Sequence, residues 1–145
     1  MSRNLNADSG MKRNPRDEAS LKKLEDLLIE KNMFEELNKI LECKYIGANK
    51  LLIIDLESRA GYSATLVGGA NDLVISDVRK LFLRKEDEDW SELPKITREC
   101  EDIRIVKAGD LILIECVKPA YSLTDLLKMV SDSKNIVVEC YYEWE

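Results

Sequence analysis

The sequence predicts a mixed α+β domain, and three observations support this fold class. Leucines recur at helical spacing within residues 18–42, short apolar runs follow from residue 44 onward, and Gly, Pro or Asn separates most of these runs. We therefore expect an N-terminal helix or helix pair, followed by the order β-β-β-α-β-β-α-β. At 145 residues, the chain suits one domain with a core of its own.

Residues 1–17 form a flexible basic tail in this interpretation, ahead of a single globular domain at 18–145. The tail contains Asn, Ser, Gly and Pro and few apolar residues. Its four basic residues outnumber its two acids, which leaves a charge of +2. Two interpretations stay open: a solvated tail without a role, or an arm that binds RNA or a partner. In the second, the RNA-binding residues are Arg3, Lys12, Arg13 and Arg16.

The helical region at 18–42 contains two apolar faces. The pattern slips at Lys31–Asn32, so either two helices or one bent helix fits it. We expect both faces to pack in the core, because a leucine stripe is far more often core than binding surface. The apolar positions are Leu21, Leu24, Leu28, Phe34, Leu37 and Leu41.

Three strands and a helix are expected in the middle of the chain. Residues 44–56 predict a strand, a Gly-Ala-Asn turn and a second strand, and residues 63–67 predict a third. After Gly68-Gly69, which we interpret as a tight turn, a helix is expected to begin near Ser76. Its proposed apolar face consists of Val78, Leu81 and Phe82.

The second half predicts an acidic loop, a hairpin, a helix and a last strand. Residues 85–94 form the loop, and 102–106 with 111–117 form the hairpin. Ser122 and Asp125 have the spacing of a capping box ahead of a clean apolar helix face. Residues 136–142 form the last strand.

Composition excludes several kinds of chemistry. The chain has no His, so no imidazole base and no histidine metal ligand is available within it. The net charge of −6 argues against broad electrostatic capture of nucleic acid. We expect no contact with a membrane, because no apolar run approaches the length of a membrane helix. We also expect a cytoplasmic protein without cofactors. Plentiful Lys and Glu without Gln lean toward a thermophile composition, although eight Asn and four Cys weaken this indication.

The four cysteines lie in or beside apolar stretches and lack the close spacing of a zinc or iron–sulfur site. We expect four reduced thiols in the core. A disulfide between Cys116 and Cys140 is the alternative, on the condition that their strands are neighbours.

The stretch GDLILIECVKP at 109–119 raises the question of a metal-dependent nuclease, in which an acid and a lysine share one face of a strand. Side chains alternate along a strand, so Glu115 and Lys118, three positions apart, face opposite sides unless a bulge intervenes. Asp110 and Glu115 also face opposite sides. Both faces of 111–116 are mostly apolar, which indicates a central strand. We therefore expect no catalytic residues; a small metal nuclease using Asp72, Asp110 and Glu115 is the third-ranked alternative.

The C-terminal sequence YYEWE places three aromatic residues beside acids. Aromatic side chains are enriched among interface anchors, and a strand at a chain end is a natural sheet edge. We therefore expect Tyr141, Tyr142 and Trp144 to contact a protein partner or a second copy of the chain. The alternative, that they close the chain's own core, is equally compatible with the sequence.

Two stretches resemble a known family. KLLIIDLESRAGY followed by GGANDLVISDVRKLFL is similar to the first domain of archaeal tRNA-splicing endonucleases, and VKAGDLILIE is similar to a strand of their catalytic domain. Arg79-Lys80 stands where that family has Glu-Ala, and the catalytic His has no counterpart. The resemblance therefore implies a structural, non-catalytic subunit that completes an RNA-processing assembly. A roadblock or profilin-like regulatory scaffold is the alternative resemblance, carried by the order of helices and hairpins.

Overall fold

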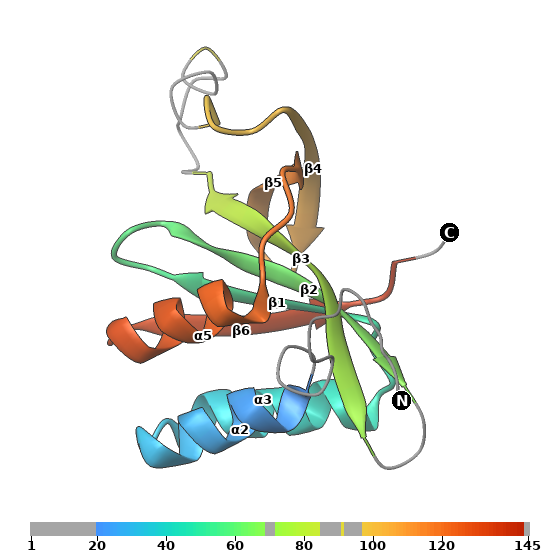
Figure 1. Cartoon of the computed structure of the whole chain (residues 1–145), viewed down its shortest axis with the longest axis vertical. Helices are drawn as coiled ribbons and strands as arrows, with labels where there is room; N and C mark the ends of the chain where they lie inside the picture. The colour runs from blue at the N-terminus through green and yellow to red at the C-terminus, as the bar shows by residue number, and fades with distance from the viewer. Residues whose placement is uncertain (1–19, 69–71, 85–90, 92–96, 144–145) are drawn as a thin grey trace, which may run out of the picture.

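The described part of the chain forms a curled, six-stranded antiparallel sheet with three helices, which confirms the mixed α+β class (Figure 1). A computed structural model describes residues 20–68, 72–84, 91 and 97–143. The helices are α2 (Leu21–Glu30), α3 (Phe34–Tyr45) and α5 (Leu123–Asp132). The strands are β1 (Lys50–Asp55), β2 (Ala60–Gly68), β3 (Leu73–Leu83), β4 (Asp102–Ala108), β5 (Leu111–Lys118) and β6 (Ile136–Tyr141).

Local sequence signals define the helix ends. The side chain of Ser20 accepts a hydrogen bond from the backbone N–H of Lys22 and begins α2. Asn32 has a φ of +59°, so the expected slip in this region separates two helices. Ser122 and Asp125 form the expected reciprocal capping box at the start of α5. None of these described helices is long and apolar enough to cross a membrane.

The strands are arranged in the order β4-β5-β3-β2-β1-β6, and every neighbouring pair is antiparallel. The expected hairpin consists of β4 and β5, joined at Gly109, whose φ of +59° suits the first residue of a tight two-residue turn. The strand β5 pairs on both sides, as expected for an interior strand. The last of the described strands, β6, pairs with β1 alone among them and is therefore an edge strand like β4.

The expected helix near Ser76 is wrong, because this segment is the long strand β3. A register shift between β2 and β3 and a φ of +50° at Asp77 interrupt the alternation of the strand. Val78 packs with the helices, whereas Leu81 packs on the opposite face of the sheet. Their spacing therefore resembles a helical face by coincidence, and the irregularity bends β3 and strengthens the curl of the sheet.

The expected strand at 44–46 is also wrong, because α3 continues to Tyr45. Gly47 follows with a φ of +74°, and the first strand begins at Lys50. The expected hairpin in this region is thus a helix end followed by a single strand.

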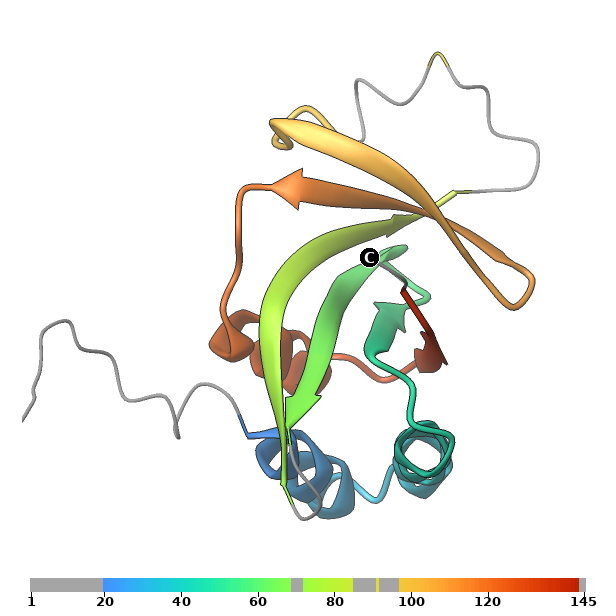
Figure 2. The same cartoon turned by 90° about the vertical axis from the view of Figure 1, so that its right-hand side faces the viewer.

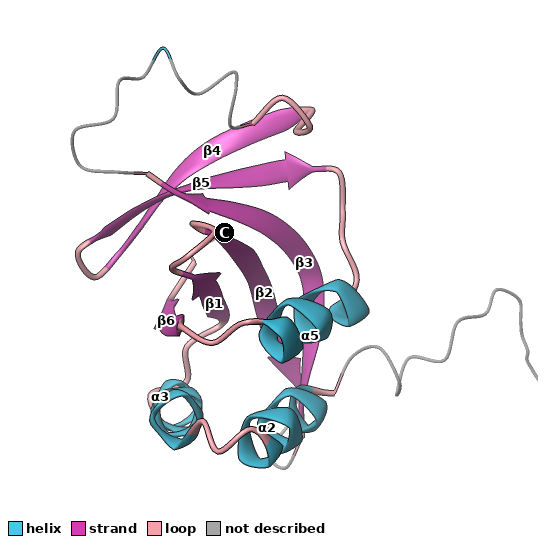
Figure 3. Cartoon of the chain, turned by 90° about the vertical axis from the view of Figure 1, so that its left-hand side faces the viewer, coloured by secondary structure: helices cyan, strands magenta, loops and turns pink. Residues whose placement is uncertain are grey.

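The sheet separates two apolar cores. The helices cover one face of β6, β1, β2 and β3, while the β4–β5 hairpin folds over the opposite face (Figure 3). Figure 2 shows the resulting curl, with β4 and β5 arching across from β1. The inner core, enclosed by the curl, contains Leu52, Ile54, Leu81, Val106, Ala108 and Leu113.

Two disulfides replace the expected reduced thiols. Cys43 in α3 is bonded to Cys140 in β6, with a Cα–Cα distance of 6.0 Å, and Cys100 is bonded to Cys116, at 5.3 Å. The alternative pair Cys116–Cys140 is wrong, because β3, β2 and β1 lie between the strands that carry these two residues.

Candidate functional site

A buried ionic cluster occupies the inner face of the curled sheet. Glu115 of β5 is its centre and is fully buried. Ser63 Oγ donates a hydrogen bond to Glu115 Oε2 at 2.5 Å, and Arg104 Nε donates to Oε1 at 2.5 Å. Arg79 Nη1 lies 3.5 Å from the same Oε1. Three strands therefore place a hydroxyl and two guanidinium groups around one carboxylate.

The cluster continues to the segment after β6. Arg104 forms a second ion pair through Nη2 with Glu143. Lys50 on β1 is buried, with its Nζ 3.6 Å from Glu143 and 3.1 Å from the hydroxyl of Thr65. The edge strand β4 is thus connected to the segment that follows the other edge strand, β6.

The arginines remain charged in this setting. Burial is the strongest single influence and opposes the charge of Arg104, but Glu115 and Glu143 together outweigh it and raise the pKa. The pKa of Arg79 is raised in the same way, by Asp77 and Glu115 against burial. Each guanidinium is therefore held as a cation by at least two carboxylates.

Tyr141 lies beside the cluster. Burial raises the pKa of Tyr141 to about 12, and the negative charges of Glu115 and Glu143 add to this effect while Arg104 opposes it. Its hydroxyl is buried without a well-aligned hydrogen-bond partner among the described residues. The ring packs against the inner core, so Tyr141 closes the chain's own fold rather than projecting from the edge.

The positive and negative charges of the cluster balance, and none of its ion-paired groups is free to act on a substrate. Lys50, Arg79 and Arg104 face three carboxylates, and each ion has a partner of opposite charge. A catalytic acid, base or nucleophile needs a group free to act on a substrate. A cavity of about 210 Å³ opens beside Arg104 and Tyr141. Two of its three charged lining residues, Arg104 and Glu143, bind each other, and the third, Lys107, is exposed. We conclude that the cluster has a structural role.

The proposed metal ligands do not converge. Asp72 lies immediately before β3, and Asp110 lies in the β4–β5 turn, where both are exposed. Glu115 is enclosed by its arginine partners. A bulge does intervene near the end of β5, because consecutive residues of β4 pair with Cys116 and Lys118, but Lys118 is exposed whereas Glu115 is buried. Within the described residues, no group of three or more Cys, Asp or Glu side chains could hold a metal ion.

A different surface stands out on α3, where two residues expected in the core are exposed. Phe34 and Leu41 are more than two-fifths exposed, and Tyr45 is 91% exposed. Asn38 is exposed as well. The expectation that both apolar helix faces are buried is therefore wrong for α3, whose buried residues are Ile40 and Cys43.

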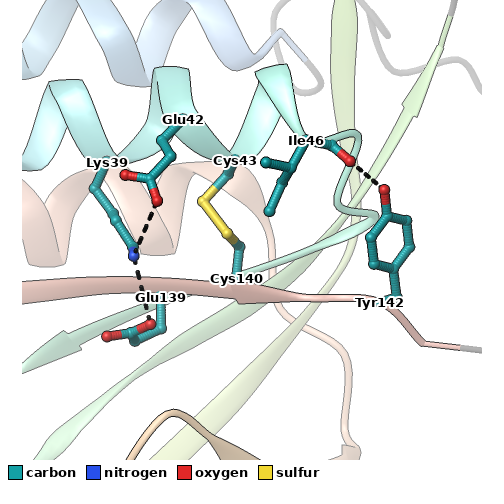
Figure 4. The surroundings of a disulfide bond; sticks show 7 residues. All are labelled: Lys39, Glu42, Cys43, Ile46, Glu139, Cys140 and Tyr142. Atoms are coloured by element: carbon teal, nitrogen blue, oxygen red, sulfur yellow. Dashed lines mark hydrogen bonds and ion pairs between the residues drawn. A yellow bond between two sulfur atoms is a disulfide. The ribbon is translucent and has the colours of Figure 1, made fainter.

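These side chains form one row. Positions 34, 38, 41 and 45 fall on a single narrow line along a helix, because they are spaced four, three and four residues apart. Ile46 and Tyr142, each about half exposed, extend the apolar surface beyond the end of α3. The hydroxyl of Tyr142 donates a hydrogen bond to the carbonyl oxygen of Ile46 (Figure 4). We call Phe34, Asn38, Leu41 and Tyr45 the α3 seam.

The expected interface residues are thus distributed differently around β6. Tyr142 contacts Ile46, just beyond the end of α3, while Tyr141 packs against the inner core. Trp144 lies outside the described residues, as do Arg3, Lys12, Arg13 and Arg16 of the basic tail and the acidic run 86–89. The 4-3-4 spacing was visible in the sequence, but spacing alone does not distinguish a core face from an exposed one.

Comparison of the chain with known protein families, with curated proteins and with solved structures found no match in any of the three.

Proposed function

We propose that this chain is a non-catalytic, partner-binding subunit, and that the α3 seam with Ile46 and Tyr142 is its contact surface. The observation that carries the proposal is the row of exposed apolar side chains on α3. Contiguous exposed apolar surface is uncommon on proteins that act alone and marks interaction sites. Single exposed apolar residues would not have this meaning, but here Phe34, Leu41 and Tyr45 follow one line along α3, and Ile46 and Tyr142 lie next to its C-terminal end.

The chemistry of the row supports an interface. Phe34, Tyr45 and Tyr142 are aromatic, and aromatic side chains are the commonest anchors of protein interfaces. Leu41 lies between the two aromatic residues of α3. The row is held on a rigid support, because the disulfide Cys43–Cys140 fixes α3 to β6 beside it (Figure 4). A prearranged surface of this kind loses little conformational entropy when a partner binds.

The balanced state of the ionic cluster supports the non-catalytic part of the proposal, because its acids and bases are already paired. As part of the same proposal, the chain works in the cytoplasm and its complex takes part in RNA processing, as the resemblance to tRNA-splicing endonucleases suggests. Two disulfides are compatible with the cytoplasm of a heat-adapted organism, where such bonds occur. The scarcity of Gln among many Lys and Glu residues agrees with that setting.

A photo-crosslinking amino acid at position 38 tests the proposal in the native host. The side chain of Asn38 lies in the α3 seam, so a crosslink should form with a partner polypeptide. A matched probe at position 105 serves as the control, because Ile105 on β4 is exposed to the same degree as Leu41, 43% and 44%. We expect a discrete adduct from position 38 and none of that size from position 105.

The same adducts test the finer parts of the proposal. RNA-processing proteins or RNA in the position-38 complex would support the role in RNA processing. Equal adducts at both positions, or none at position 38, would contradict the partner-binding proposal. Metal-dependent cleavage of RNA or DNA by the purified chain, lost in Glu115→Gln, would contradict its non-catalytic part.

A further inference from the structure

We propose that the occupant of the α3 seam is an amphipathic helix of another protein, with basic residues along one flank. This inference rests on the proposed function and specifies the kind of partner. It follows from the spacing of the seam, from its central Asn and from the charge of its flank.

The spacing of the seam is that of a helix–helix contact. Residues that recur at alternating intervals of four and three along a helix form the a and d positions of a coiled-coil interface. Phe34 and Leu41 occupy one set of these positions, and Asn38 and Tyr45 occupy the other. Such a straight, narrow row accepts the side chains of a second helix lying alongside it.

Asn38 lies in the middle of the seam and restricts how a partner helix can be aligned with it. A lone Asn at such a position is tolerated best opposite a polar group, because a buried amide without a partner is costly. The position of the polar residue on the partner helix is therefore fixed. Tyr45, which is 91% exposed, would lose most of its contact with water once a partner helix covered this end of the seam.

The open flank of the seam is acidic. Glu35 and Glu42 are both exposed and lie seven residues apart, so they border the seam on the same side. Lys39 lies beside them and pairs with Glu42 at 3.7 Å and with Glu139 of β6 at 3.8 Å, so three acids stand here against one lysine and the flank stays acidic (Figure 4). On the other side, Lys44 is already paired with Glu25, at 3.1 Å. Charges that flank a helix seam select partners of opposite sign, so the partner helix should carry Lys or Arg beside its apolar row. The net charge of −6 favours the same partner.

A second copy of this chain fits the seam less well. In an antiparallel pair, the flank with Glu35 and Glu42 would face the same flank of the other copy, and like charges would meet. In a parallel pair, Glu42 would face Leu37 and gain no opposite charge. The charges on the flank therefore favour a basic helix from a different protein over a second copy.

Synthetic helical peptides of about three heptads test the inference on the full chain with both disulfides intact. The probe peptide has Leu at its seam positions, one Asn, and Lys along both flanks. A matched peptide has Glu in place of these Lys residues and is otherwise identical. Binding is measured by fluorescence anisotropy of the labelled peptides at low and at moderate salt.

We expect the Lys-flanked peptide to bind at least about tenfold more tightly than the Glu-flanked peptide, with the preference reduced by salt. Leu41→Ser should weaken binding at least about tenfold, whereas Ile105→Ser should leave it unchanged. The double variant Glu35→Lys with Glu42→Lys should reverse the preference between the peptides. This reversal is independent of any loss of stability, because a damaged protein would bind both peptides poorly.

Equal binding of the two peptides, no binding of either, or an unchanged preference after charge reversal would each overturn the inference. A dimer of the full chain in analytical ultracentrifugation that Leu41→Ser dissociates would overturn it as well, since the occupant would then be a second copy. If position 38 still forms a specific crosslink in the host, the inference alone fails and the proposed function stands. If that crosslink is absent too, both fail.

Discussion

Arg104 forms an ion pair with Glu143 across the open side of the curled sheet. Arg104 belongs to the edge strand β4, and Glu143 follows the other edge strand, β6. Their contact holds the two edges of the sheet toward each other, while Arg104 also binds the buried Glu115 of β5. The curl of the sheet is therefore stabilised by an ion pair at its open side and by apolar packing in the inner core.

Removing the central carboxylate should destabilise the fold strongly. Glu115→Ala leaves Arg79 and Arg104 without their shared partner inside the sheet, and we expect the free energy of unfolding to fall by about 3 kcal/mol. Urea denaturation followed by circular dichroism measures this change. Asp110→Ala is the matched control, because Asp110 is exposed in a turn and its loss should change stability by less than about 0.5 kcal/mol. Similar stability in both variants would contradict the structural role of the cluster.

Tyr141 should make the fold sensitive to alkaline pH. Burial raises the pKa of Tyr141 to about 12, whereas an exposed Tyr has a pKa near 10. The folded state therefore holds the phenol proton more tightly, so its contribution to stability is full below about pH 10 and is lost as the pH rises toward 12. Between pH 8 and pH 11, we expect the free energy of unfolding of the parent chain to fall by about 1–2 kcal/mol more than that of Tyr141→Phe. Urea denaturation at these two pH values measures the difference, and an equal fall in both proteins would argue against a buried phenol.

Two adjacent residues of α3 should respond oppositely to substitution. Ile40 is fully buried, so Ile40→Ala should lower the free energy of unfolding by about 2–4 kcal/mol. Leu41 faces outward, so Leu41→Ala should change it by less than about 0.5 kcal/mol and instead weaken partner binding. Thermal and urea unfolding of the two variants measure the difference. Equal destabilisation would mean that Leu41 is a core residue and that the α3 seam is not open.

The two disulfides should differ in how much they stabilise the chain. Cys43 and Cys140 are 97 residues apart, whereas Cys100 and Cys116 are 16 apart. Because a longer loop loses more entropy when it is closed in the unfolded chain, we expect about 4–5 kcal/mol from the first bond and about 3 kcal/mol from the second. Unfolding of the paired Cys→Ala variants measures both values. Free thiols detected in the oxidised, denatured protein would contradict the pairing.

Elements with a complete local signal were predicted correctly from the sequence. The capping box at Ser122 and the apolar face that follows it define α5 without reference to the rest of the chain. The β4–β5 hairpin and β6 have apolar runs bounded by turn residues. In each case the residues that determine the element lie within it.

The errors arise where distant parts of the chain decide the outcome. The positive φ of Asp77 disturbs the alternation of β3, so a strand imitates a helical face. Phe34 and Leu41 have the pattern of core residues, yet the sheet reaches only the other side of α3. The acid at 115 was correctly placed on an interior strand, but its partners Ser63, Arg79 and Arg104 come from three other strands, and no local pattern reveals them. The cysteine pairs likewise depend on which elements pack together.

The Cys43–Cys140 bond also determines how the molecule would respond to mechanical load. A partner that pulls on α3 would pull directly on β6 through a covalent link, and from there on β1 through the backbone hydrogen bonds of an antiparallel pair. Force would then be shared along the length of two strands rather than concentrated on the packing between a helix and a sheet. The helix that presents the α3 seam is therefore difficult to peel away, even though it lies on the outside of the fold.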